Sequence, residues 1–379
     1  MPDAPRPSLH SRMHLALQQA QTARLQAPPN PAVGCVITDA HDQILGQGHT
    51  QAVGGPHAEI MALRDAAAHG RSVAGATAYV TLEPCSHQGR TGPCCDALIQ
   101  AGIAKVVASI ADPNPLVAGQ GFARLRAAGI EVAVGPGADA ARELNIGFFS
   151  RMVRKTPWAR MKIAATLDGK TALPDGRSQW ITGEAARTDG HAWRARACAV
   201  LTGIGTVLAD RPRLDVRLIE TPRQPHLVVV DSRLETPLDA PLFIAGRRIY
   251  IYCAVQNDAQ ISALEARGAT VIVLPGAPGP SGRLPKVDLG AMMRNLAQRE
   301  INEVHIEAGE KLNGSLVREG LVDEFLIYLA PKMLGAGLGM AAFGPLADLD
   351  AAVPLTFRSA DRFGADLRIL ARVTGRDLF

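Results

Sequence analysis

Short hydrophobic runs separated by polar turns predict a layered α/β domain in the first part of the chain. A strand period or a buried apolar run marks the predicted strands, which are residues 31–39, 43–50, 76–82, 105–110 and 130–135. Helical spacing marks the predicted helices, which are residues 11–27, 57–68, 94–101, 119–129 and 138–149. The order β-β-α-β-α-β-α-β implies a sheet with helices on both of its faces.

A second α/β pattern follows the charged, proline-containing stretch RMVRKTPW at residues 151–158. Its predicted strands are residues 159–166, 199–205, 226–231, 248–253, 270–274, 303–309 and 324–331. Its predicted helices are residues 183–197, 287–300 and 311–320. With no internal repeat between the halves, we expect two different domains, residues 1–153 and 154–379.

Composition narrows the function classes. The 379 residues are 47% hydrophobic and 20% charged with a net charge of +4, which fits a two-domain globular protein and argues against nucleic-acid binding. Six irregularly spaced cysteines argue against a disulfide framework. The N-terminus lacks the apolar segment of a signal peptide, and no apolar run has the length of a membrane span. We expect a cytoplasmic protein that is not in a membrane.

The strongest chemical signal lies between residues 55 and 95. His57 and Glu59 form H-A-E, and Cys85 follows the next predicted strand in E-P-C. Imidazole and thiolates are ligands that Zn²⁺ prefers, and three protein ligands leave one position for water. Zn²⁺ lowers the pKa of that water to about 7, and a carboxylate that is not a ligand, here Glu59, can carry the proton. The pattern is typical of zinc-dependent nucleobase deaminases.

The third zinc ligand remains a choice between neighbouring residues. Gln88 stands where the common P-C-x-x-C spacing has its second cysteine, and the next thiols are Cys94 and Cys95. We favour Cys94, because it follows Pro93 at the start of a predicted helix, where the helix dipole favours a thiolate. His87 is the competing ligand.

Three segments of the second half predict binding of a phosphorylated cofactor. TGIGTVLAD (202–210) and IEAGEKLNGSL (306–316) each place glycines between a strand and a helix, where backbone N–H groups bind anions. VVVDSR (228–233) ends in Ser232 and Arg233, which suit the 2′-phosphate of NADP. A tight turn and a capped turn are the plain alternatives for these segments.

Other polar residues of this half gather near the predicted strand ends. Trp180, flanked by polar residues, is predicted to form the wall of a wet pocket rather than core. Arg194 and Arg217 suit the clamping of a phosphate, with a solvated surface as the plain alternative.

The ordered motifs resemble the bifunctional riboflavin-biosynthesis deaminase/reductase family over nearly the whole chain. The matching stretches include PNPAVGCVI (29–37), PHAEIMAL (56–63), TLEPCSHQGRTGPC (81–94), KIAATLDGKTA (162–172), SQWITG (178–183) and GIGTVLADRPRLDVR (203–217). The family's wide cysteine spacing supports Cys94. The resemblance implies a cytidine-deaminase-like three-layer αβα domain followed by a dihydrofolate-reductase-like α/β domain.

The resemblance also implies two reactions and their site residues. The first domain would deaminate 2,5-diamino-6-ribosylamino-4(3H)-pyrimidinone 5′-phosphate with Zn²⁺, and the second would reduce the ribosyl group to ribityl with NADPH. It implies zinc ligands His57, Cys85 and Cys94 and proton carrier Glu59. Implied substrate contacts are Asn30, His49 and Arg90 in the deaminase and Lys162, Ser178, Thr182, Arg194, Leu214, Arg217 and Glu307 in the reductase. Implied cofactor contacts are Ala164, Trp180, Thr206, Asp210, Ser232 and the run Gly309, Glu310, Lys311, Leu312, Asn313, Gly314 and Ser315.

The chain departs from the family pattern at a few positions. Met61 replaces a usual Asn, Cys198 replaces a usual Asp, and LADRPRLDVR replaces LADDPxLTVR. Arg211 and Asp215 therefore lie where reductase contacts can differ.

Two other readings of the second domain remain. An RNA-binding appendage to a nucleic-acid-editing deaminase should carry a basic stripe and exposed aromatics, whereas aromatics are only 4% of this chain. A structural dimerisation module is the other alternative. We expect a small-molecule substrate and a homo-oligomer.

Overall fold

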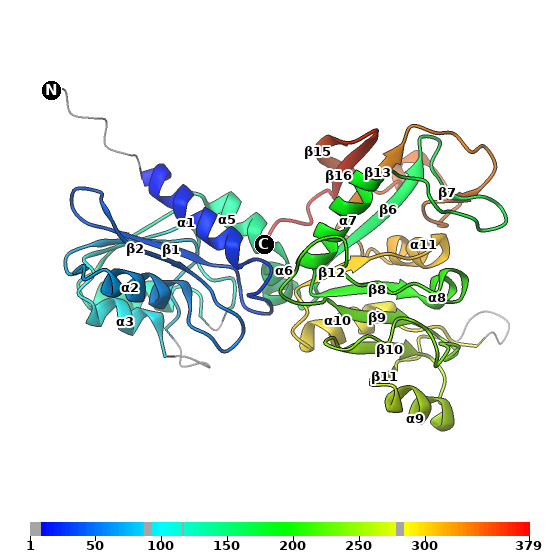
Figure 1. Cartoon of the computed structure of the whole chain (residues 1–379), viewed down its shortest axis with the longest axis horizontal. Helices are drawn as coiled ribbons and strands as arrows, with labels where there is room; N and C mark the ends of the chain where they lie inside the picture. Colours follow the sequence, from blue (N-terminus) through cyan, green and yellow to red (C-terminus); the bar gives the residue numbers. More distant parts are fainter. Residues whose placement is uncertain (1–8, 87–91, 116, 278–283) are drawn as a thin grey trace. The chain divides into compact units, whose positions relative to one another are not determined.

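The chain folds into two compact units, seen in a computed structural model that describes residues 9–86, 92–115, 117–277 and 284–379. One unit runs to Arg154 and includes Phe379, and the other is Lys155–Leu378. Each unit has its own sheet (Figure 1).

The first unit is built on a five-stranded mixed sheet with the order β2-β1-β3-β4-β5. Its strands are β1 (Gly34–Thr38), β2 (Ile44–His49), β3 (Thr77–Val80), β4 (Lys105–Ala108) and β5 (Glu131–Val134). β1 pairs antiparallel with β2 and β3, while β3, β4 and β5 run parallel. All five strands predicted along this part of the chain are therefore present.

Helices cover both faces of this sheet, which makes three layers (Figure 1). They are α1 (Leu9–Ala23), α2 (Ala58–Ala68), α3 (Cys94–Gln100), α4 (Gln120–Ala127), α5 (Ala138–Leu144) and α6 (Ile146–Arg154). Successive residues of a strand point their side chains to opposite faces of the sheet. Cys35 and Ile37 join a core with residues of α2, α3 and α4, whereas Val36 packs with Met13 of α1.

The predicted helix over 138–149 is two helices. It divides at Asn145, whose side-chain amide donates to the carbonyl of Ala32 (2.9 Å) and accepts from its N–H (2.7 Å). Asn145 is 5% exposed, so these bonds satisfy the hydrogen-bonding groups of a buried amide. Such side-chain bonds to the backbone compete with continuation of a single helix.

The second unit has a nine-stranded sheet with the order β11-β10-β9-β8-β12-β6-β13-β16-β15. Its strands are β6 (Trp158–Thr166), β8 (Ala199–Gly203), β9 (His226–Val230), β10 (Ile249–Cys253), β11 (Ala269–Val273), β12 (Glu303–Ile306), β13 (Glu324–Ala330), β15 (Leu355–Phe363) and β16 (Asp366–Val373). In this sheet order, the seven strands from β11 through β13 run parallel to one another. β16 pairs antiparallel with β13, and β15 pairs antiparallel with β16 at the edge of the sheet. All seven predicted strands are therefore present.

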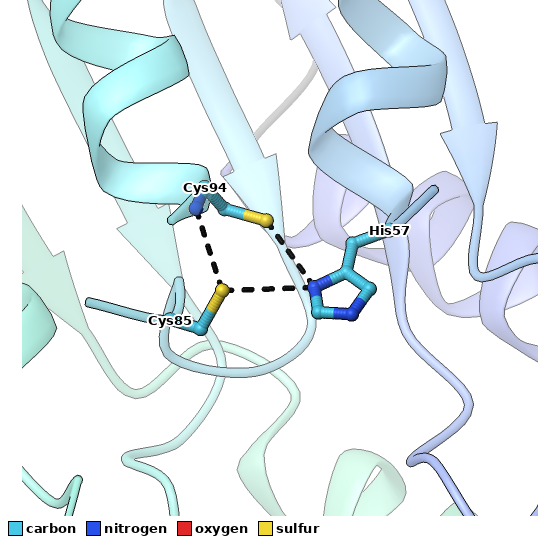
Figure 2. A group of neighbouring side chains, drawn as sticks. All are labelled: His57, Cys85 and Cys94. Carbon is cyan, nitrogen blue, oxygen red and sulfur yellow. Dashed lines mark hydrogen bonds between the residues drawn. The ribbon is translucent and has the colours of Figure 1, made fainter. Parts of the chain in front are cut away.

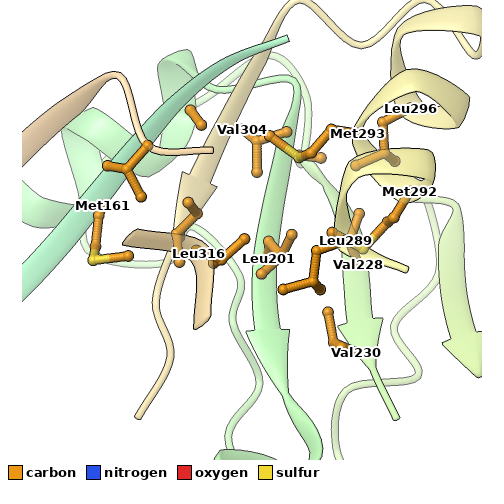
Figure 3. Close-up of a cluster of buried hydrophobic side chains, with 14 of the residues drawn as sticks. Met161, Leu201, Val228, Val230, Leu289, Met292, Met293, Leu296, Val304 and Leu316 are labelled. Carbon is orange, nitrogen blue, oxygen red and sulfur yellow. The ribbon is translucent and has the colours of Figure 1, made fainter. Parts of the chain in front are cut away.

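Helices also pack on both faces of this sheet. They are α7 (Glu184–Arg196), α8 (Ile204–Asp210), α9 (Asp258–Ala266), α10 (Leu289–Gln298) and α11 (Glu310–Arg318). Figure 3 shows α10 placing Leu289, Met292 and Leu296 over Leu201 and Val228 of the strands. Alternate residues of the same strands, such as Val200 and Val229, pack with Leu264 of α9.

Several elements were missed from sequence. They are helices α8 and α9, the hairpin β15–β16, and the small sheet of β7 (Lys170–Ala172) with β14 (Leu338–Gly339). β15 is mostly exposed, and its apolar alternation is interrupted after Phe357, where the pairing register shifts, so its sequence gives only a weak strand period. Within the described residues, none of the helices combines the length and hydropathy that crossing a bilayer requires.

We expect Leu316→Ala to destabilise the second unit by about 2–5 kcal/mol, because Leu316 is fully buried in the core beneath α11. The chain's three tryptophans, Trp158, Trp180 and Trp193, all lie in this unit, so tryptophan fluorescence during urea unfolding reports on it. Leu349→Ala is the control, because Leu349 is 91% exposed. Equal urea midpoints for the two variants would contradict this assignment of the core.

Candidate functional site

Two cysteines and a histidine meet at the helix starts of the first unit. His57 precedes the first residue of α2, Cys85 lies in the loop after β3, and Cys94 begins α3. The Nδ1 of His57 lies 3.6 Å from the Cys85 sulfur and 3.3 Å from the Cys94 sulfur (Figure 2). The N–H of Cys94 also donates to the Cys85 sulfur at 3.3 Å.

This donor set fits a zinc ion. The three ligand atoms lie within 4.8 Å of one another. A tetrahedral zinc ion with ordinary Zn–S and Zn–N lengths separates nitrogen from sulfur by about 3.6 Å, close to the observed distances. Hydrogen bonding by Cys94 lowers the pKa of Cys85 to about 4, so one thiolate is already favoured.

Cys95 faces away from this group. It is fully buried, and its thiol donates to the main-chain carbonyls of Pro84 (3.2 Å) and Gly121 (3.5 Å). Burial raises the pKa of Cys95 to about 12. The structure thus brings Cys94 to His57 and Cys85, and gives Cys95 a packing role. The competing ligand His87 and the predicted substrate contact Arg90 lie outside the described residues.

Glu59 lies beside the zinc-ligand set, in the first turn of α2. Its side chain is buried and hydrogen-bonded with the Cys94 thiol. Burial raises the pKa of Glu59 to about 7, so the carboxyl group can both accept and release a proton near neutral pH.

Sequence reasoning missed Glu83, which fixes the loop that carries Cys85. Its Oε1 accepts from the N–H groups of Gly121 (2.8 Å) and Phe122 (3.3 Å) at the start of α4. Its Oε2 accepts from those of Asp112 (3.1 Å) and Gly119 (3.0 Å). The partners lie far along the chain, so only the E-P-C motif itself could have drawn attention to it.

The other predicted deaminase contacts lie near strand β2 and the end of α1. His49 ends β2, and its Nδ1 lies 3.2 Å from the Oε1 of Gln19. Burial lowers the pKa of His49, which favours the neutral ring. Asn30 lies in the loop after α1. Among the described residues, neither side chain hydrogen-bonds to the zinc-ligand set.

The second unit brings three predicted substrate contacts together. Glu307 follows β12 and forms a paired hydrogen bond with Arg194 of α7, at 2.7 and 3.0 Å. Lys162 of β6 places its Nζ 3.9 Å from the same carboxylate. Burial alone would raise the pKa of Glu307, but Arg194 and Lys162 together hold that pKa below its ordinary value. Burial lowers the pKa of Lys162.

The two glycine turns lie side by side, because β8 and β12 are neighbouring parallel strands. A side chain on Gly309 would come within 3.9 Å of the Thr206 hydroxyl, while one on Gly205 would meet nothing within 4 Å. The first-turn N–H groups of α11 have no partner inside the helix. A cradle of main-chain amides beside open space fits the phosphates of a dinucleotide.

The remaining residues of the run 309–315 have partners within the protein. Glu310 accepts from the N–H of Gly339 (2.8 Å), and Asn313 donates to the carbonyl of Met340 (2.9 Å). Gly314 has no room for a side chain, because a Cβ would lie 2.0 Å from the carbonyl oxygen of Ala342. The Ser315 hydroxyl donates to the carbonyl of Lys311, and Leu312 packs at the core.

The other predicted contacts of this unit lie in loops or within its strands and helices. Ser178, Trp180 and Thr182 lie before α7, where Lys332 holds the Trp180 carbonyl at 3.3 Å. Trp180 is 62% exposed, and the Arg187 guanidinium lies 4.7 Å from its ring centre, as suits a pocket wall rather than core. Ala164 lies on β6, and Asp210 ends α8.

The VVVDSR segment is a capped turn. The buried Asp231 accepts from the N–H groups of Glu235 (3.0 Å) and Thr236 (2.8 Å). Ser232 accepts from the N–H of Val287 at 3.2 Å, and Arg233 is exposed. The side chain left for a ligand is thus chiefly that of Arg233.

His305 was also missed. Its ring is fully buried, 3.5 Å from Glu307, and neither ring nitrogen has a hydrogen-bond partner among the described residues. Burial lowers the pKa of His305 to about 3, so the ring is neutral.

Comparison with known proteins covers both units. The family model for the cytidine and deoxycytidylate deaminase zinc-binding region matches residues 7–110, and that for the RibD C-terminal domain matches residues 157–369. The riboflavin biosynthesis protein RibD of Escherichia coli is 42% identical over 94% of this chain and 96% of its own length. The chain belongs to the RibD family.

Other relatives agree with this assignment. The RibD protein of Aquifex aeolicus is 38% identical over 94% of this chain and 96% of its own. A solved structure of Acinetobacter baumannii RibD has a TM-score of 0.85 at 37% identity, with 96% of this chain and 98% of that chain covered. The Thermotoga maritima deaminase/reductase has a TM-score of 0.83 at 30% identity, with the same coverage.

The family assignment confirms the predicted class of fold and function. The chain is a bifunctional deaminase and reductase of riboflavin biosynthesis, with a zinc-binding deaminase domain followed by a RibD-type reductase domain. The readings of the second domain as an RNA-binding appendage or a purely structural module are therefore wrong.

We expect Cys94→Ser to lose most bound zinc and Cys95→Ser to keep it, because the Cys94 sulfur lies beside His57 whereas the Cys95 sulfur donates to the carbonyl of Pro84. Zinc content of the purified proteins by mass spectrometry measures this directly. The two variants carry the same chemical change at adjacent positions, so each is the control for the other. Full zinc in Cys94→Ser would contradict the ligand set.

Proposed function

We propose that the first unit deaminates 2,5-diamino-6-ribosylamino-4(3H)-pyrimidinone 5′-phosphate and that the second reduces the ribosyl group of the product to ribityl with NADPH. The domains correspond to residues 1–153 and 154–379. The observation that carries the deaminase half is the convergence of His57, Cys85 and Cys94 next to a buried Glu59. The similar Thermotoga maritima protein is a diaminohydroxyphosphoribosylaminopyrimidine deaminase and 5-amino-6-(5-phosphoribosylamino)uracil reductase, which supports these substrates.

In the deaminase, Glu59 moves the protons. Zn²⁺ held by His57, Cys85 and Cys94 supplies an activated water as nucleophile. Glu59 would accept one proton of that water and donate it to the ring nitrogen next to the attacked carbon. It would then take the second proton from the hydroxyl group left on that carbon and donate it to the amine, so that the C–N bond breaks, ammonia leaves and a carbonyl group remains. A carboxyl group whose pKa burial raises to about 7 suits both directions of transfer.

We expect Glu59→Gln to lower the deaminase rate by about 10²–10⁴-fold and to keep zinc, because the amide has a similar shape but cannot carry the proton. Ammonia release measures the deaminase, and zinc content measures the ligand set. Glu131→Gln is the matched control, since Glu131 is exposed on β5 and pairs only with Lys105 among the described residues. Deamination at the wild-type rate in Glu59→Gln would remove Glu59 from this role.

In the reductase, Lys162 is the better proton donor of the two candidates. NADPH supplies the hydride for the anomeric carbon when it is bound. Before reduction the ribose ring opens: the bond from the anomeric carbon to the ring oxygen breaks, and that oxygen needs a proton. Arg194 holds Glu307 as a carboxylate, so Glu307 is a poor acid. Burial lowers the pKa of Lys162, so its ammonium releases a proton more readily.

We expect Lys162→Met to lower the reductase kcat by about 100-fold and to remove the fall in rate at alkaline pH from the profile of kcat against pH. In the wild type the rate falls as pH rises through the lowered pKa of Lys162, since only the ammonium form donates. NADPH oxidation with deaminated substrate gives the pH profile. Lys286→Met, on an exposed lysine of the same unit, is the control. An alkaline limb that persists in Lys162→Met would assign it to another group.

The other assigned contacts complete the proposal. In the deaminase they are Asn30, His49 and Arg90, and in the reductase they are Ser178, Thr182, Leu214 and Arg217 for substrate. The cofactor contacts are Ala164, Trp180, Thr206, Asp210, Ser232 and residues 309–315, supported by the paired glycine turns. The cytoplasmic location and the homo-oligomeric state stay predictions.

A further inference from the structure

A buried carboxylate in the second unit holds the side chains of two arginines. Asp215 is 3% exposed, and its Oδ1 accepts from the Nη1 of Arg217 at 2.8 Å. Its Oδ2 accepts from the Nε of Arg213 at 2.9 Å and lies 2.7 Å from the Nη2 of Arg213. Both guanidinium groups are about half-exposed, and each keeps further N–H donors.

The turn that carries this trio is fixed by other residues. Leu214, between Arg213 and Asp215, has a φ of 51°, which only a well-supported turn holds in a non-glycine residue. Arg247 donates to the main-chain carbonyls of Leu214 (2.6 Å) and Arg213 (2.7 Å). The N–H of Arg217 donates to His191 of α7 at 3.1 Å. The two exposed guanidinium groups therefore extend from a firmly held backbone.

The same turn is connected to the proposed reductase centre. Arg194 donates through Nη1 to the main-chain carbonyl of Asp215, while its other nitrogens hold Glu307. Lys162 places its Nζ 3.9 Å from the Oε2 of that carboxylate. Cations outnumber carboxylates in this connected group; burial lowers the pKa of Arg247, and repulsion by Arg194 and Arg213 lowers that pKa further. An anion bound there would offset the excess charge.

We propose that Arg213 joins Arg217 in binding the phosphate monoester of the reductase substrate and that Asp215 is the positioning residue that directs both guanidinium groups. Guanidinium groups bind phosphate through paired hydrogen bonds, and a pair held in place in advance loses less entropy on binding. Arg213 is therefore a specificity residue for the phosphorylated substrate, and the inference rests on the proposed reductase function.

The test compares the substrate with its dephosphorylated form in the full-length protein. Arg213→Gln should raise KM for the phosphorylated substrate by about tenfold, leave kcat within about twofold, and leave KM for the dephosphorylated form unchanged. Arg294→Gln is the matched control: it makes the same change at an exposed arginine of α10 in the same unit. KM for NADPH should not change in either variant.

Three results would overturn the inference. The first is an unchanged KM for the phosphorylated substrate in Arg213→Gln. The second is an equal rise for both substrate forms, which would indicate a structural effect. The third is a change in KM for NADPH in place of substrate KM, which would assign the arginines to the 2′-phosphate of the cofactor. Absence of any NADPH oxidation by the wild type would instead defeat the proposed function, a separate outcome.

A double-mutant cycle tests the role of Asp215. In an Asp215→Thr background, Arg213→Gln should change KM by less than about twofold, because Arg213 is no longer directed. An undiminished tenfold effect there would overturn the positioning role. Tryptophan fluorescence checks that the variant is folded, and Asp215→Asn, which keeps the side-chain shape, provides the same cycle if Asp215→Thr does not fold.

Discussion

The geometry of the deaminase centre depends on one buried carboxylate that does not touch the zinc-ligand atoms. The Glu83 carboxylate accepts hydrogen bonds from the main-chain N–H groups of Asp112, Gly119, Gly121 and Phe122. These bonds hold the loop that carries Cys85 against the start of α4. Charge-assisted hydrogen bonds of this kind are about twice as strong as neutral ones. Because Gly121 lies against the Pro84 carbonyl with no room for a Cβ, the two segments are in close contact.

The same contact explains why two adjacent cysteines have different roles. Cys95 donates to Pro84 and Gly121, the two residues that Glu83 draws together, so its thiol is turned into the core. One position earlier on α3, Cys94 then faces His57. Successive residues of a helix point about 100° apart, so fixing one of them inward places the other at the zinc site.

Sequence reasoning predicted the zinc-ligand set because its information is local. His57 and Glu59 share one helix turn, Cys85 follows β3 and Cys94 begins α3, so the spacing indicates convergence. The choice of Cys94 over Cys95 and His87 depended on the predicted helix start and on the family resemblance. The role of Glu83 could not be predicted, since its partners lie 29 to 39 residues further on. In the second unit the strands followed from apolar runs, but the contacts among Lys162, Arg194 and Glu307 depend on the pairing of β6 with β12 and on the packing of α7, which the sequence does not show. Within the hairpin β15–β16, β16 alternates apolar residues, whereas β15 is mostly exposed.

The buried imidazole of His305 makes the reductase unit less stable in acid. An unfolded histidine titrates near pH 6.5, while the buried ring has a pKa of about 3. Between these values the unfolded chain binds the extra proton, so unfolding gains about 1.4 kcal/mol for each pH unit lost. Mildly acidic buffers would thus lower the free energy of unfolding of the reductase unit at pH values where carboxylates such as Glu307 are still ionised.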